Sequence, residues 1–201
     1  MSVTPTRDRR AERREATRAE ILEAASELMR KHGVAGLSLR DLGQKVGMRA
    51  QSLYSYFDSK EAIYDALFGE GCQGYVDLRR SVPRTGDARA DFRTGTRHFF
   101  DFCLEDPARY QLLFQRTIPG FEPSPESYAP SVEGLEMTRQ ALVEAGGTDP
   151  CDLDLFTAIV TGLIDQQVSN DPGGDRWYRL LDEALDMFFT YVDARGKGRT
   201  A

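Results

Sequence analysis

The chain has 201 residues, of which 40% are hydrophobic and 29% are charged, and its formal net charge is −6. This composition is typical of a folded globular protein and excludes a disordered chain, a collagen and a small disulfide-built domain. No apolar run approaches the roughly 18 residues of a membrane helix, and the charged N-terminus lacks the apolar segment of a secretory signal. We therefore expect a cytoplasmic protein whose three cysteines, Cys72, Cys103 and Cys151, are free buried thiols rather than metal ligands or disulfide partners.

The charge is unevenly distributed along the sequence. Residues 1–60 contain 12 Lys and Arg against 8 Asp and Glu, whereas the rest of the chain contains 14 against 24. A basic N-terminal part on an acidic body predicts that the first part contacts a polyanion. Uneven surface charge without a function is the alternative.

Helical periodicity runs through the sequence, and no strand pattern or internal repeat interrupts it. The first predicted helix begins at Thr17, where Thr17 and Glu20 fit a capping box, and ends at Gly33. Residues 7–16 either extend this helix or remain disordered.

Two short helices joined by a glycine come next. Ser38 fits the cap of the first helix, and Gly43 leaves room for a helix that crosses it closely. Gly47 fits a left-handed turn before a second helix from about Arg49 to Phe57. Asp58 and Glu61 then fit the capping box of a third helix, so the segment predicts a helix-turn-helix.

The remaining sequence is also expected to be helical. Helices are predicted near 87–105, from Asp106-Pro107, from Ser131 to Gly146, and over 151–169 and 175–194, with a proline-rich loop at 117–130. The predicted fold class is therefore all-α.

Residues 18–68 resemble the DNA-binding domain of the tetracycline-repressor (TetR) family. The resemblance lies in the order of Leu42, Val46-Gly47, Ser52-Leu53-Tyr54-Ser55-Tyr56-Phe57 and Ser59-Lys60-Glu61. The sequence departs from the common family pattern at Gly43 and at Gln51-Ser52. The resemblance implies a transcriptional regulator, most often a repressor, and not an enzyme. It implies a helix-turn-helix domain with a basic arm over 1–60 and a helical ligand-binding and dimerisation domain over 61–201.

A recognition helix needs adaptable polar side chains at the end that faces the major groove. Arg49 can bind guanine in bidentate fashion, Gln51 can bind adenine, and Ala50 can contact a thymine methyl group. Flanking hydroxyl and ammonium groups would hold phosphates, in agreement with the positions that the resemblance implies. The predicted contacts to double-stranded DNA are Ser38, Arg40, Arg49, Ala50, Gln51, Ser52, Tyr54, Tyr56 and Lys60. The alternatives are a solvated Arg49 and core packing of the two tyrosine rings.

One recognition helix reads few base pairs, so tight binding to a palindromic operator requires a dimer. Residues 151–169 and 175–194 carry apolar side chains on more than one face, together with small residues that permit close helix approach. The predicted homodimer interface includes Phe156, Ala158, Thr161, Gly162, Met187 and Tyr191, and the resemblance implies a four-helix interface there. Burial of both faces within one subunit is the alternative.

Seven aromatic residues between Phe92 and Phe121 either form the core or line an apolar cavity. The resemblance implies a cavity whose small-molecule effector moves the DNA-binding domains apart. The predicted lining is Phe99, Phe102, Cys103, Tyr110, Phe114 and Gln166, with no metal, cofactor or membrane partner. A DNA-binding dimer without a ligand and a helical enzyme with His98 as its base are the alternatives. The lack of phosphate-loop, nucleophile-elbow and metal-ligand motifs disfavours the enzyme.

Overall fold

The computed structural model describes residues 9–198, which contain helices and no strand. The helices are α1 (Arg9–His32), α2 (Leu39–Lys45), α3 (Ala50–Leu53), α4 (Lys60–Ser81), α5 (Ala88–Glu105), α6 (Pro107–Phe114), α7 (Pro125–Glu144), α8 (Pro150–Asn170) and α9 (Leu181–Gly198), with short 3₁₀ helices at Val34–Gly36 and Tyr178–Leu180. The all-α prediction is confirmed. Over this part of the chain, no helix has the length and apolarity needed to cross a membrane.

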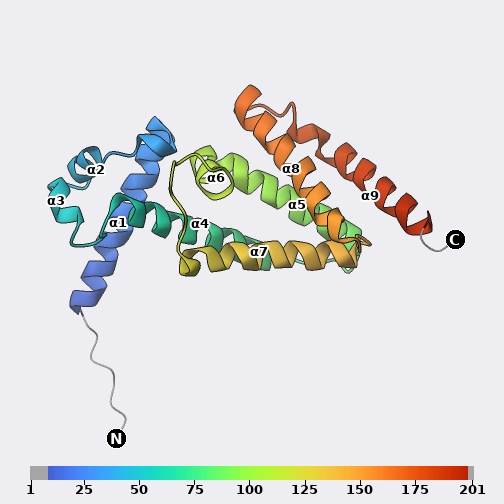
Figure 1. Cartoon of the computed structure of the whole chain (residues 1–201), viewed down its shortest axis with the longest axis horizontal. Coiled ribbons are helices and arrows are strands. Elements are labelled where there is room, and N and C mark those ends of the chain that lie inside the picture. The colour runs from blue at the N-terminus through green and yellow to red at the C-terminus, as the bar shows by residue number, and fades with distance from the viewer. Residues whose placement is uncertain (1–8, 199–201) are drawn as a thin grey trace, which may run out of the picture.

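The N-terminal domain consists of α1, α2, α3 and the first two turns of α4 (Figure 1). Ile21 and Ala25 of α1 pack with Leu42, Leu53 and Ile63, all nearly inaccessible to solvent. These side chains come from four helices, so burial of their apolar faces fixes the arrangement of the short helices, which would not be stable in isolation.

The first helix is longer than its capping motif predicts. α1 begins at Arg9, so residues 9–16 extend the helix, and residues 1–8 of the predicted basic arm lie outside the described residues. Thr17 lies within the helix, where its hydroxyl donates to the Arg13 carbonyl at 3.0 Å. The predicted capping box at Thr17 is therefore wrong. The predicted stop at Gly33 is confirmed, because this glycine has a φ of 79°, which other residues rarely adopt.

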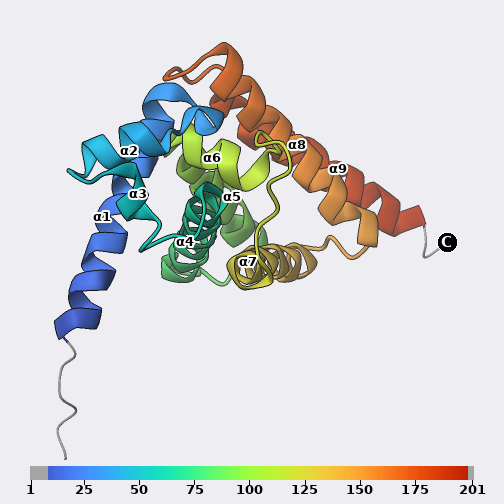
Figure 2. The ribbon, with the colours of Figure 1, turned by 60° about the vertical axis from the view of Figure 1, so that its left-hand side comes forward.

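The remaining helices form a second bundle. α7 packs along α4, and α8 and α9 lie side by side across α5 on the opposite side of the bundle (Figures 1 and 2). Their shared core contains Phe92, Phe100, Ile164, Leu185 and Phe188. Most of the aromatic residues between Phe92 and Phe121 belong to this core or pack against it.

The two cores divide within α4. Leu67 belongs to the N-terminal core and Phe68 to the second core, so the boundary lies beyond the predicted position at residue 60. Ala108 and Leu112 of α6 also pack in the N-terminal core. A continuous helix and a shared interface therefore join the two domains.

Two further helix starts differ from the sequence predictions. Ser59 rather than Asp58 caps α4, since its hydroxyl accepts the Ala62 N–H at 3.2 Å. α7 begins at Pro125, inside the predicted loop, because Ser124 caps it and proline at the first helical position loses no hydrogen bond.

The cysteines are free, as predicted, but they are not all buried. Cys72 and Cys103 are buried in the second core, whereas Cys151 is exposed in the first turn of α8. The prediction of three buried thiols is therefore wrong for Cys151.

Candidate nucleic-acid interface and ligand cavity

Two glycines set the geometry of the helix-turn-helix. A Cβ on Gly43 would lie 2.8 Å from the Met48 carbonyl oxygen and 3.0 Å from the Ala50 backbone nitrogen, so α2 and α3 can approach this closely because position 43 has no side chain. Gly47 turns the chain between them with a φ of 70°. Leu53, 1% exposed, anchors α3 in the core and leaves its opposite edge in solvent.

The nine residues predicted to contact DNA lie in or beside this motif. Five are exposed, namely Arg40, Arg49, Gln51, Ser52 and Tyr54, and four are half-buried, namely Ser38, Ala50, Tyr56 and Lys60. Ser38 caps α2 by accepting the Asp41 N–H at 3.4 Å. The Tyr54 side chain is 52% exposed, so its ring is not part of the core.

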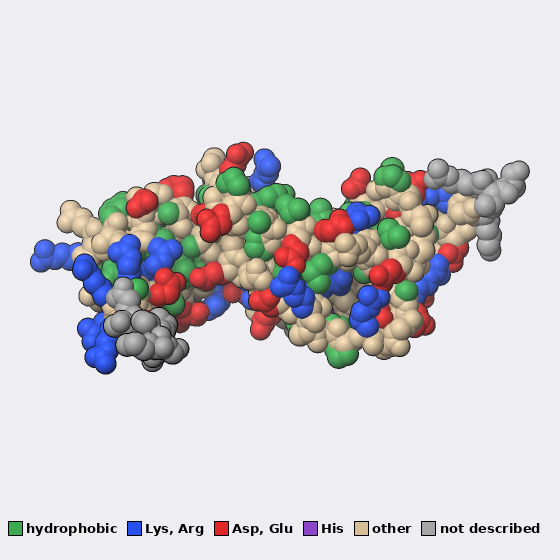
Figure 3. All heavy atoms as spheres, turned by 90° about the horizontal axis from the view of Figure 1, so that it is seen from below, with side chains coloured by type: hydrophobic (Ala, Val, Ile, Leu, Met, Phe, Trp, Pro, Cys, Tyr) green, Lys and Arg blue, Asp and Glu red, His purple; other side chains and the backbone are tan. Residues whose placement is uncertain are grey.

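The predicted contacts do not include a basic surface on the first turns of α1. Arg9, Arg13 and Arg14 are exposed there, and the Arg14 guanidinium lies 5.5 Å from the centre of the Tyr56 ring. Arg18 lies 4.2 Å from the centre of the Phe57 ring and fixes α1 beside the end of the motif. Lys and Arg side chains gather at this end of the molecule (Figure 3). In the sequence, the run of arginines before Thr17 indicates this basic surface.

A cavity of about 190 Å³ lies in the second domain. Its walls come from four helices and the end of α6, and consist of Cys72, Tyr75 and Arg79 of α4, Phe92, Thr96 and Phe99 of α5, Phe114 of α6, Ser131, Gly134, Leu135 and Thr138 of α7, and Thr157, Val160 and Thr161 of α8. It is largely apolar, and it is placed where the helix that leaves the N-terminal domain meets α7.

Two of the six predicted lining residues, Phe99 and Phe114, lie at this cavity. Phe102 and Cys103 are buried in the core, and the Tyr110 hydroxyl donates to Asp165 at 2.6 Å. All three side chains are buried, and none of them lines this cavity. Gln166 is exposed and accepts a hydrogen bond from Asn170 instead.

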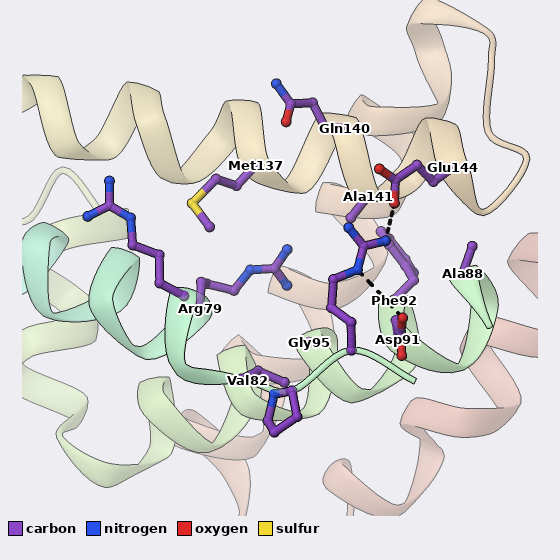
Figure 4. Close-up of a pocket in the computed structure, with 13 residues that line it drawn as sticks. Arg79, Val82, Ala88, Asp91, Phe92, Gly95, Met137, Gln140, Ala141 and Glu144 are labelled. Atoms are coloured by element: carbon purple, nitrogen blue, oxygen red, sulfur yellow. Dashed lines mark hydrogen bonds and ion pairs between the residues drawn. The ribbon is translucent and has the colours of Figure 1, made fainter. Parts of the chain in front are cut away.

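A second cavity of about 300 Å³ adjoins the first and shares Arg79 and Phe92 with it (Figure 4). Charged side chains surround it, including Asp91 of α5 and Glu144 of α7. None of the predicted lining residues lies on α4 or α7, because the way these two helices cross α5 is a tertiary feature without a local sequence signal.

α8 and α9 both carry exposed apolar or small residues. On α9, Met187 is 69% exposed and Tyr191 49%. On α8, Ala158 is exposed, and a Cβ on Gly162 would meet nothing within 4 Å. Leu155 of α8, 38% exposed, was not predicted.

Two of the predicted interface residues lie elsewhere. Phe156 is 6% exposed, with its ring centre 4.8 Å from that of Phe92 and 5.9 Å from that of Phe188. It therefore fills the core and presents little surface to a partner. Thr161 lines the cavity, and its hydroxyl donates to the Thr157 carbonyl at 2.7 Å.

Polar contacts connect the two domains. The Arg30 Nε of α1 donates to Asp106 Oδ2 at 2.9 Å, and Asp106 caps α6 by accepting the Arg109 N–H at 3.0 Å. Asp65 of α4 accepts the Ser124 N–H at 2.7 Å at the start of α7. These contacts join α6 to α1 and the start of α7 to α4.

An exposed recognition helix on an all-helical body defines a class of DNA-binding regulators. The family model described as bacterial regulatory proteins, tetR family, matches residues 21–67. The helix-turn-helix domain of the chain therefore matches the DNA-binding domain of this family. No group of three or more His, Cys, Asp or Glu side chains in residues 9–198 could hold a metal ion.

Curated relatives are named as regulators rather than enzymes. An HTH-type transcriptional regulator of Mycobacterium tuberculosis is 29% identical over 127 residues, which cover 60% of this chain and 53% of that protein. The chain thus spans about half the length of this relative. The class A tetracycline repressor from transposon 1721 of Escherichia coli is 28% identical over 183 residues, covering 84% of this chain and 79% of the repressor.

Solved structures share the fold. The fatty acid degradation regulator FadR of Bacillus halodurans superposes with a TM-score of 0.70 at 16% identity, covering 94% of this chain and 96% of that one. The TetR family regulator PfmR of Thermus thermophilus has a TM-score of 0.61 at 20% identity, covering 86% of this chain and 94% of that one. The body of the chain therefore has the architecture found in this family.

Proposed function

We propose that the chain is a homodimeric transcriptional repressor that binds a palindromic operator and is released from it by an apolar small molecule. The exposed edge of α3 carries the proposal. The Arg49 side chain there has no hydrogen bond or ion pair to another described residue. It is therefore free to donate to guanine, with Gln51 beside it for adenine.

The exposed apolar and small residues of α8 and α9 support the homodimer. Large exposed side chains at Met187, Tyr191 and Leu155 form an apolar surface of the kind that usually marks an interaction site. Small residues at Ala158 and Gly162 permit close approach of a second α8. A two-fold axis here would pair two recognition helices for the two halves of a palindrome.

The position of the cavity supports ligand control. A ligand between α4 and α7 would shift helices that Asp65 and Asp106 connect to the N-terminal domain. A ligand that binds the DNA-incompetent arrangement more tightly must lower operator affinity by the ratio of its two affinities. A typical allosteric coupling of ~1–3 kcal/mol corresponds to a loss of about 5- to 150-fold.

The test starts with selection of the operator from random DNA, followed by affinity measurements with and without small molecules that raise the melting temperature. Arg49→Ala should relax the choice at one base position by ~1–3 kcal/mol. Tyr54→Phe should weaken every sequence alike. Arg139→Ala, an exposed change on α7, is the matched control and should alter neither.

The outcomes separate the parts of the proposal. An unchanged base preference for Arg49→Ala would refute its reading role, and a non-palindromic operator would refute the dimeric arrangement. Cavity ligands that stabilise the fold without changing operator affinity would favour a repressor without ligand control.

A further inference from the structure

The arginine at the junction of the two cavities has no partner for its charge. Arg79 lines both the cavity of about 190 Å³ and the neighbouring one of about 300 Å³. Its guanidinium packs against Gly95 of α5, where a Cβ would overlap it. Among residues 9–198, Arg79 forms no ion pair and its side chain forms no hydrogen bond.

The neighbouring arginines are committed to carboxylates. Arg80 pairs with Glu133 and lies 3.6 Å from Asp77. Arg84 pairs with Glu144 and lies 3.6 Å from Asp91. The dashed lines in Figure 4 end on Glu144 and Asp91, and none reaches Arg79.

Three threonine hydroxyls of the apolar cavity are committed to backbone carbonyls. Thr96 donates to the Phe92 carbonyl at 2.8 Å, Thr138 to the Gly134 carbonyl at 3.0 Å and Thr161 to the Thr157 carbonyl at 2.7 Å. Arg79 is the one cationic side chain among the described residues that line this cavity. Burial raises the pKa of Tyr75, and the positive charge of Arg79 acts on the same hydroxyl in the opposite direction.

We propose that the effector is an organic carboxylate whose apolar body packs against Tyr75, Phe92 and Phe99 and whose acid group binds Arg79. This inference rests on the proposed function and adds one charged group to the otherwise apolar ligand. A planar guanidinium donates two parallel hydrogen bonds to a carboxylate, which a neutral head group cannot match. An apolar cavity of about 150 Å³ holds a benzene molecule. The cavity of about 190 Å³ therefore fits one ring with a short chain, with the acid at the junction.

The test compares 4-phenylbutanoate with 4-phenyl-1-butanol, which has the same carbon skeleton and no charge. Binding of each to the full chain is measured by calorimetry. The wild type should bind the acid about ten- to a hundredfold more tightly, because hydrogen bonds to charged groups exceed neutral ones by this margin. Arg79→Met keeps the apolar stem, should remove this preference and should weaken the alcohol far less than the acid, since the alcohol forms no ion pair with the guanidinium.

Two further variants provide the control and an independent perturbation. Arg80→Met removes an arginine that already pairs with Glu133 and should leave the acid preference intact. Gly95→Ala leaves the charge in place but displaces the guanidinium, and should weaken the acid more than the alcohol.

Equal binding of acid and alcohol to the wild type overturns the inference, as does an acid preference that survives Arg79→Met. Failure of 4-phenylbutanoate to bind at millimolar concentration also overturns it. Operator release is measured separately with the same two compounds. Acid binding that depends on Arg79 but leaves operator affinity unchanged would refute the proposed ligand control and leave the assigned ligand class standing.

Discussion

Asp106 performs two structural tasks, and substitutions can separate them. Its carboxylate caps α6 through the Arg109 N–H at 3.0 Å and accepts a hydrogen bond from the Arg30 Nε of α1 at 2.9 Å. Asp106→Ala removes both contacts. Asp106→Asn keeps an oxygen for the cap but removes the charge, and Arg30→Met removes the ion pair but keeps the cap.

The expected magnitudes follow from burial. Loss of an N-cap costs ~0.5–2 kcal/mol, and Asn caps a helix as well as Asp does. The Arg30 side chain is 46% exposed and that of Asp106 is 12% exposed. Solvent therefore limits the ion pair to ~0.2–1 kcal/mol. Asp106→Ala should lower the free energy of unfolding by ~1–3 kcal/mol, and Asp106→Asn and Arg30→Met by less than ~1 kcal/mol each.

The assay is thermal and urea unfolding of the wild type, the three single variants and the Asp106→Asn/Arg30→Met pair at one fixed protein concentration. Asp106→Ala should lower the melting temperature by ~2–12 °C, since 1 kcal/mol corresponds to ~2–4 °C in a chain of this size. The double variant should be less destabilised than the sum of its single changes, because both remove the same pair. If Asp106→Asn proves as damaging as Asp106→Ala, the cap is not the main contribution. Full additivity in the double variant would mean that Arg30 and Asp106 do not interact.

Two further predictions concern the dimer and the thiols. Gly162→Leu should shift the mass measured by light scattering toward the 22.6 kDa monomer. It should not lower the stability of the subunit, because a Cβ at this position meets nothing within 4 Å. Gly74→Leu, equally unobstructed but on α4, should leave the dimer intact, and equal effects of the two substitutions would contradict the α8 interface. At pH 8 a thiol reagent should modify Cys151 rapidly and leave Cys72 and Cys103 largely unreacted, because burial raises the pKa of Cys72 to about 11 and also raises that of Cys103, which keeps both protonated. Loss of the fast phase in Cys151→Ser is the check, and a second fast thiol would contradict the burial.

The helix-turn-helix could be located from the sequence because its signals are local. Gly33 and Gly47 adopt positive φ angles of 79° and 70° at the ends of their helices, as predicted. Ser38 caps α2, and the helical spacing of apolar residues puts Leu42 and Leu53 on the buried faces of their helices. Each of these features depends on neighbours within a few turns, so the residue order suffices to specify it.

The aromatic segment left a packed core and a cavity open, and the lining of the cavity could not be predicted. The aromatic residues of α5 are close in sequence, yet Phe99 faces the cavity while Phe102 packs in the core. The crossing of α4, α7 and α8 over α5 decides which face of α5 lines the cavity and which face packs in the core. The sequence does not distinguish Arg79 from the arginines that follow it. In the structure, Glu133 pairs with Arg80 and Glu144 pairs with Arg84, whereas no carboxylate in the described part of the chain pairs with Arg79.

The sequence by itself determined the helical class, the helix-turn-helix segment and the apolar surplus of the last two helices, since capping, glycine turns and periodicity act over short distances. The tertiary structure decided that Phe156 fills the core, that Thr161 lines the cavity, and that α4 joins both domains as one helix. Apolar helical faces have similar compositions whether they pack in the core, line a cavity or face a partner. The side chains that distant helices place against a face decide which of these roles it has.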